Sequence, residues 1–296
     1  MTTSHPEYRV AFHLIQILYF DADACLPPGR DYRRLWLGLS RFGSQKMTGA
    51  FWTPDNVPKK SRRFKIGDPN AFEAFDNRLD APVHGGGLCQ KYGVARPNQD
   101  CDLYITIGEE SRCSFGATPP FFQFAVSNEL IDSVGMKDML AMLCMNLEIL
   151  DASRPNYGFI DIARPEETFA GCAYTSPWYR RLPLHRYMEH ARWIASAAEK
   201  RDEARSVFWG NYFGPRLLEK LGGREQFLEE WREATRLVDG SATALIWEFE
   251  HGVFIGLSKN PMGCAPGEIL DAFDMANSEW LFKKLSRHNA LLGGRA

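Results

Sequence analysis

The stretch 206–223, SVFWGNYFGPRLLEKLGG, constrains the fold of this chain more than any other. Its first half is dense in apolar and aromatic side chains, which is typical of a buried strand. Gly214-Pro215 then interrupts the pattern, and proline fits the first position of a helix because its missing N–H would have no partner there. Leucines follow at helical spacing, and Gly222-Gly223 can adopt the left-handed conformation that ends a helix. The stretch predicts a strand, a tight corner, a short helix and a stop, and such a corner is more often scaffold than site.

The same stretch carries a family resemblance, in the residues Trp209-Gly210-Asn211-Tyr212-Phe213-Gly214-Pro215, Leu217-Leu218 and Leu221-Gly222-Gly223. They resemble a pattern in bacterial immunity proteins of type VI secretion systems, a family formerly of unknown function. In that family a second helix and a terminal strand pair follow. The resemblance implies a helix at 224–237 and strands at 244–250 and 252–258, before Asn260-Pro261. It covers roughly the last third of the chain and rests on structural residues, so it supports the fold more than the function.

Length and composition indicate a globular protein. The 296 residues suffice for one domain or for two lobes, about 1–178 and 179–296, joined near 177–183. No apolar run approaches the ~18 residues of a membrane span, and residues 1–10 lack a secretory signal, so we expect a cytoplasmic protein. The seven cysteines contain no Cys-x-x-Cys pair, which favours reduced thiols over disulfides or a zinc site. They are Cys25, Cys89, Cys101, Cys113, Cys144, Cys172 and Cys264.

Strand and helix patterns are mixed along the chain without regular alternation. Strands are predicted at 8–20, 102–108, 112–115, 121–126 and 157–163, and helices at 30–42, 136–152, 184–201 and 268–285. This order predicts an α+β fold, with a largely antiparallel sheet and helices packed on it. The helix at 136–152 carries a methionine stripe of Met136, Met139, Met142 and Met145. The stripe could be an adaptable binding face, but packing in the core is favoured.

Charge is unevenly distributed. Residues 30–65 hold ten bases and two acids, whereas residues 241–282 hold six acids and one base. The asymmetry predicts either two differently charged faces or a partner matched to one of them. Alternatively, the two regions neutralise each other within one fold.

Catalytic motifs are scarce. The chain has no Gly-x-Ser-x-Gly elbow, no His-Glu-x-x-His and no phosphate-binding loop. Asp21 and Asp23 follow the first predicted strand and could hold a divalent metal, although a solvated turn is the commoner use of this spacing. The basic run 59–65, KKSRRFK, could track a nucleic-acid backbone or form an exposed loop.

The expected function is therefore that of a cytoplasmic immunity protein. It would neutralise a type VI secretion toxin, with a nuclease as the natural candidate, by occluding the active site without turnover or cofactor. We expect no membrane or direct nucleic-acid contact, and the chain could form a homodimer. An acidic face would contact the toxin through Glu248, Glu250, Glu268, Asp271 and Asp274. The alternatives are a metal-assisted enzyme using Asp21 and Asp23, or a nucleic-acid-binding module using 59–65.

Overall fold

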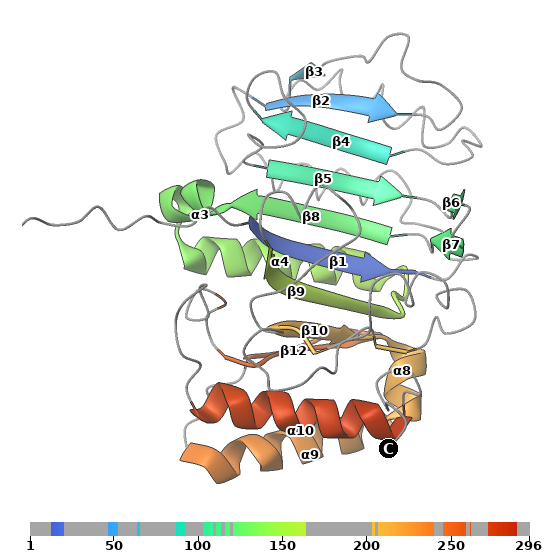
Figure 1. Cartoon of the computed structure of the whole chain (residues 1–296), viewed down its shortest axis with the longest axis vertical. Helices are drawn as coiled ribbons and strands as arrows, with labels where there is room; N and C mark the ends of the chain where they lie inside the picture. The colour runs from blue at the N-terminus through green and yellow to red at the C-terminus, as the bar shows by residue number, and fades with distance from the viewer. Residues whose placement is uncertain are drawn as a thin grey trace, which may run out of the picture.

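The fold is built on a seven-stranded antiparallel sheet (Figure 1). The computed structural model describes residues 13–20, 47–52, 64–65, 87–92, 103–108, 111–113, 116–118, 121–163, 203–204, 207–239, 245–258, 261 and 272–288. The sheet has the order β11-β12-β10-β9-β1-β8-β5, and each neighbouring pair is antiparallel. Its strands are β1 His13–Tyr19, β5 Leu103–Gly108, β8 Phe121–Ser127, β9 Tyr157–Ala163, β10 Gly210–Phe213, β11 Leu245–Glu248 and β12 Val253–Gly256. The predicted α+β fold with an antiparallel sheet is confirmed.

Two smaller sheets complete the β-structure. A three-stranded sheet has the order β3-β2-β4, with β2 Met47–Trp52, β3 Phe64–Lys65 and β4 Gly87–Tyr92. β4 lies beside β5, so this sheet continues one end of the large one (Figure 1). A short hairpin pairs β6 Ser111–Cys113 with β7 Gly116–Thr118.

The central strand β1 has the composition of a strand buried on both faces. Its residues from Leu14 to Tyr19 are buried, and it pairs with β8 on one side and β9 on the other. A continuous apolar run, rather than strict alternation, is expected for a strand covered on both sides. The strand predicted at 8–20 is present over its described part, and residues 8–12 lie outside the described residues.

Helices α3 Asn128–Val134 and α4 Met136–Asp151 follow β8 directly. The Ser127 hydroxyl accepts a hydrogen bond from the Leu130 N–H, which caps α3. Met139 and Met142 of α4 are buried, so this part of the methionine stripe is core, as favoured. Inside the core, the Gln16 Nε2 donates to the Leu143 carbonyl at 3.0 Å, and the Asn146 Nδ2 donates to the Gln16 Oε1 at 2.9 Å. These bonds attach α4 to the face of the sheet that carries Gln16.

The predicted strand, corner, helix and stop are all present. β10 ends at Phe213, Pro215 opens α8 Pro215–Lys220, and Gly222 and Gly223 have φ of +105° and +95°. A Cβ on Gly214 would lie 1.8 Å from the Pro155 carbonyl oxygen, so only glycine fits this corner.

The implied helix and strand pair after the corner are also present. The helix is α9 Arg224–Asp239, two residues longer than implied, and the strands are β11 and β12. The last helix, α10 Ala272–His288, ends three residues beyond the predicted boundary. The predicted helices at 30–42 and 184–201 lie outside the described residues, as does the proposed lobe boundary at 177–183.

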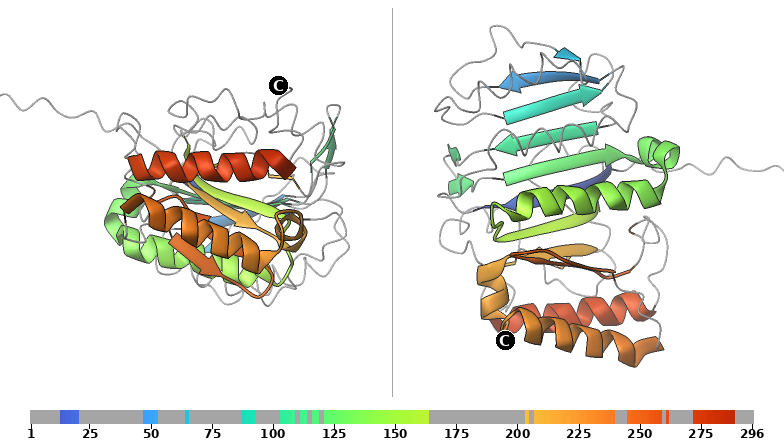
Figure 2. Two further views of the ribbon diagram at one scale, coloured as in Figure 1. Left: turned by 90° about the horizontal axis from the view of Figure 1, so that it is seen from below. Right: turned by 180° about the vertical axis from the view of Figure 1, so that it is seen from behind.

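Helices α9 and α10 lie side by side near the β11 end of the sheet (Figures 1 and 2). Trp280 of α10 packs its ring against both Phe227 and Trp231 of α9. Phe227 also contacts Phe213 of β10, with ring centroids 5.0 Å apart. Phe213 and Tyr212 are adjacent in β10, so their side chains point to opposite faces of the sheet. The register places Tyr212 on the face of Leu18 and Gln16, and Gln16 is hydrogen-bonded to α4. Helices α4 and α9 therefore pack on opposite faces of the sheet.

Candidate partner-binding site

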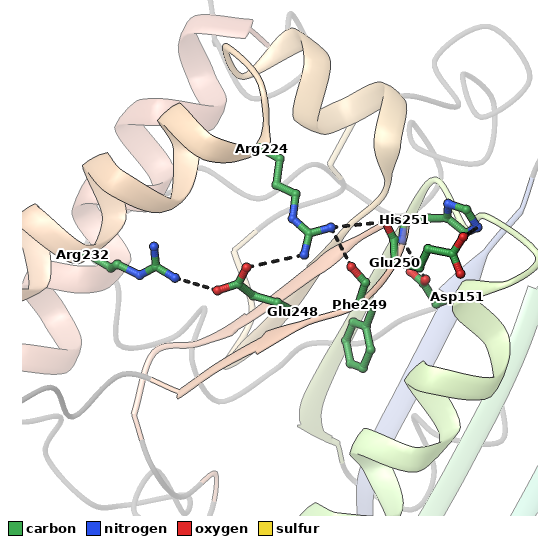
Figure 3. A network of polar contacts seen from close by, with 7 residues as sticks. All are labelled: Asp151, Arg224, Arg232, Glu248, Phe249, Glu250 and His251. Atoms are coloured by element: carbon green, nitrogen blue, oxygen red, sulfur yellow. Dashed lines mark hydrogen bonds and ion pairs between the residues drawn. The ribbon is translucent and has the colours of Figure 1, made fainter.

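Glu248, one of the residues predicted to contact a partner, lies on β11 between two arginines of α9 (Figure 3). The Arg232 Nη2 donates to the Glu248 Oε1 at 2.6 Å, and the Arg224 Nη2 lies 3.5 Å from the Oε2. Arg224 and Arg232 are eight residues apart, about two helical turns, so they project from one side of α9. The Glu248 side chain is 42% exposed, yet its charge is offset by the two arginines. Its visible role is to attach β11 to α9.

The turn between β11 and β12 presents Glu250 to solvent. The Glu250 side chain is 84% exposed. Beneath it, the Arg224 Nη1 donates to the carbonyl oxygens of Phe249 at 2.6 Å and Glu250 at 3.2 Å (Figure 3). The Phe249 N–H donates to the Gly252 carbonyl at 3.0 Å and closes the turn. An exposed carboxylate thus stands on a backbone held by charge-assisted hydrogen bonds.

Asp151, the last residue of α4, anchors this turn to the core. Its carboxylate is buried and accepts hydrogen bonds from the Tyr212 hydroxyl at 2.6 Å and the His251 N–H at 2.8 Å. Burial, together with the charge of Asp151 and this hydrogen bond, raises the pKa of Tyr212 well above its usual range, although Arg224 acts in the opposite direction. Tyr212 is therefore a permanent donor. Gly252 lies against it, since a Cβ there would be 2.2 Å from the Tyr212 hydroxyl oxygen.

The structure brings two of the five predicted partner-binding residues together. Glu248 and Glu250 share the β11–β12 hairpin. Asp274 lies in the first turn of α10, while Glu268 and Asp271 lie outside the described residues. The structure therefore leaves the five-residue acidic face as a prediction.

The sites of the two alternative functions lie mostly outside the described residues. Asp21 and Asp23 are not among them, and only Phe64 and Lys65 of the basic run are, as strand β3. Within the described ranges, no three His, Cys, Asp or Glu residues are grouped so that they could hold a metal ion. In the same part of the chain, no helix has the length and apolar character needed to cross a bilayer.

Sequence reasoning missed an acidic row on α9. Glu225, Glu229 and Glu233 recur every four residues, and all three are exposed. They lie one residue beyond Arg224, Leu228 and Arg232, so the row borders the side of the helix that faces β11. The i, i+4 repeat was readable in the sequence. Its position beside β11 was not, because it depends on the packing of α9 against the hairpin.

The chain shares its fold with a protein of a type VI secretion system. No protein-family model matches the chain, and no curated protein matches it. Among solved structures it is similar to the Pseudomonas aeruginosa T6SS protein PA0821, with 16% sequence identity and a TM-score of 0.60. The likeness covers 98% of this chain and 76% of that chain. At this level of identity the likeness shows the fold alone.

Proposed function

We propose that this chain is an immunity protein that binds a type VI secretion toxin in the cytoplasm and neutralises it. The observation that carries the proposal is the fold likeness to a T6SS protein over 98% of the chain. The strand, corner, helix and hairpin that carry the family resemblance are also present as implied. Together they support a link to a type VI secretion system. Neutralisation would require only that the chain cover the active site of the toxin.

The proposed toxin is a nuclease, an enzyme whose substrate, nucleic acid, is an anion. An enzyme that binds nucleic acid needs a basic surface, and an acidic antidote can cover that surface and associate with it rapidly. Glu250 is the first candidate contact, since it is 84% exposed and its backbone is fixed by Arg224. Glu248 contributes less net charge because Arg224 and Arg232 already offset it. Glu268, Asp271 and Asp274 complete the proposed surface.

The function is tested first by capture from the native bacterium. The tagged chain is the bait, and co-eluting proteins are identified by mass spectrometry. We expect one stoichiometric partner that, once purified, cleaves nucleic acid and loses this activity when mixed with an equimolar amount of the chain. A partner that retains full activity in the mixture, or the absence of a partner while the toxin is expressed, would contradict the proposal.

The acidic surface is tested by charge reversal. The double variant Glu250→Lys and Asp271→Lys should slow association with the toxin by about tenfold at low salt, because steering acts mainly on the association rate. The difference should shrink as salt rises. The double variant Asp138→Lys and Glu219→Lys is the charge-matched control, since it reverses two exposed charges on α4 and α8. An equal effect of the two double variants would show that only net charge matters.

A further inference from the structure

Strand β11 ends the large sheet, and within the described part of the chain β12 is its only strand neighbour. Its residues Leu245, Ile246 and Trp247 are only half-buried. Edge strands are usually protected by a proline, a lysine or a bulge. The sequence LIWE has no proline or lysine, and its register with β12 is continuous. Its single charge, on Glu248, is offset by two arginines. β11 therefore keeps the features of an edge that accepts another strand.

The hydrogen-bonding register shows which backbone groups are free to pair. The Phe249 N–H points toward β12, because it donates to the Gly252 carbonyl. Alternate residues of an antiparallel strand direct their N–H and C=O groups to opposite sides. Trp247 therefore pairs inward with Phe254, while Ile246 and Glu248 direct their N–H groups to the outer side of the sheet. These two amides are the donors available to an added strand.

The charge around this edge identifies the chemistry of its partner. Residues 224–239 and 245–251 hold seven acids and three bases. Glu230 pairs with Lys284 and Glu248 with the two arginines. The exposed row of Glu225, Glu229 and Glu233 forms no ion pair with any described residue. A basic segment would therefore meet complementary charge along β11.

We propose that β11 is the docking edge for the toxin, and that an extended basic segment of the toxin adds to it as a further strand. The inference rests on the proposed function, and it names the segment chemistry and the binding mode. Strand addition supplies affinity through the backbone, while flanking side chains supply selectivity. A second copy of this chain is a poorer occupant. Two β11 edges paired antiparallel, about a two-fold axis normal to the sheet, would place both acidic α9 helices on the same face, where their charges repel.

The edge is tested by amide hydrogen exchange with two defined probes. One is a blocked peptide of alternating lysine and valine, and the other alternates glutamate and valine. In the free chain we expect the Ile246 and Glu248 amides to exchange rapidly. A saturating amount of the basic peptide should slow both by about tenfold or more, whereas the acidic peptide should not. Slow exchange in the free chain would show that the edge is already covered and would overturn the inference, as would the absence of protection by the basic peptide.

A matched pair of variants isolates the backbone contribution. Ile246→Ala and Ile246→Pro both remove the isoleucine side chain, but only proline removes the outward N–H, and prolines are tolerated in edge strands at such positions. The proline variant should bind the basic peptide about tenfold more weakly than the alanine variant. Equal affinity would overturn the inference. If the proline variant fails to fold, a second variant tests the charge argument. Changing Glu225, Glu229 and Glu233 to Gln should abolish the salt dependence of peptide binding. An unchanged salt dependence would overturn the charge argument.

The same variants separate this inference from the proposed function. If the wild-type chain neutralises a toxin and the alanine and proline variants neutralise it equally well, the docking edge is wrong and the immunity function stands. If the basic peptide adds to β11 but the chain neutralises no toxin, the assignment of the partner is wrong. Neutralisation by the alanine variant with loss in the proline variant supports both.

Discussion

Strands β10 and β11 flank the same neighbour but have different environments. Each has four residues and pairs antiparallel with β12, one on either side. All four residues of β10 are buried, whereas those of β11 are half-buried or exposed. β10 has β9 on its other side, and β11 has no further strand within the described ranges. Two strands of similar length and apolar content thus occupy an interior and an edge position.

The difference shows where the hydrogen-bonding capacity of each strand is used. In β10, the Asn211 side chain accepts from the Phe208 N–H and the Tyr157 hydroxyl and donates to the Phe208 carbonyl. Tyr212 donates to Asp151. In β11, the Glu248 side chain binds α9, but the outward backbone groups have no partner from a described strand. β10 is therefore scaffold, and β11 is the strand with capacity left for a partner.

The largest expected effect comes from the corner that follows β10. Gly214→Ala would place a Cβ 1.8 Å from the Pro155 carbonyl oxygen and 2.8 Å from that of Asn156. Because both obstacles are backbone, neither can rotate away, and we expect a loss of about 3 kcal/mol or more in the free energy of unfolding. Urea unfolding measures this loss. Glu219→Ala, at an exposed position of α8, is the control and should change stability little. A loss below about 1 kcal/mol for Gly214→Ala would contradict the rigid corner.

A smaller effect is expected at the link between β10 and the hairpin. Tyr212→Phe removes the 2.6 Å hydrogen bond to Asp151 and leaves the His251 N–H as its remaining donor. A buried carboxylate that loses a donor should cost about 1–3 kcal/mol. Tyr157→Phe is the matched control, since its 3.3 Å bond to Asn211 is longer and joins uncharged groups. Thermal unfolding of both variants tests the ranking, which fails if Tyr157→Phe is the more costly.

The sequence predicted local elements well because their signals are local. Leucine spacing, Pro215 and the glycine pair placed α8 and its ends within a residue or two. The contacts that define the candidate site were not predictable in this way. The Tyr212–Asp151 bond joins residues 61 apart, and the His251–Asp151 bond joins residues 100 apart. Glu248 was predicted as a partner contact, and its pairing with two arginines was not predicted, because it depends on the packing of α9 against β11. Local periodicity carries no information about such pairs.

The smallest expected effect concerns the support of α9, and through it of β11. Lys284 of α10 donates to the Glu230 carboxylate at 2.7 Å, and Gln226 donates at 2.8 Å. The hydrogen bond from Lys284, followed by that from Gln226, lowers the pKa of Glu230. A carboxyl group whose pKa is lower in the folded state stabilises that state above its unfolded pKa of about 4.5, and the contribution is lost as pH falls through the folded value.

The test is the pH dependence of stability in Glu230→Gln. At neutral pH the variant should be less stable than the wild type by less than about 1 kcal/mol, since the pair is partly exposed to solvent. The two should converge as the pH falls below about 4.5, because protonation then removes the same charge from the wild type. Glu279→Gln is the control, since its contact with Lys283 is longer, at 3.8 Å, and lies within α10. A difference that persists at low pH would show that Glu230 acts through packing rather than charge. In that case the ionic link to α10 would not be what holds α9 in place beside β11.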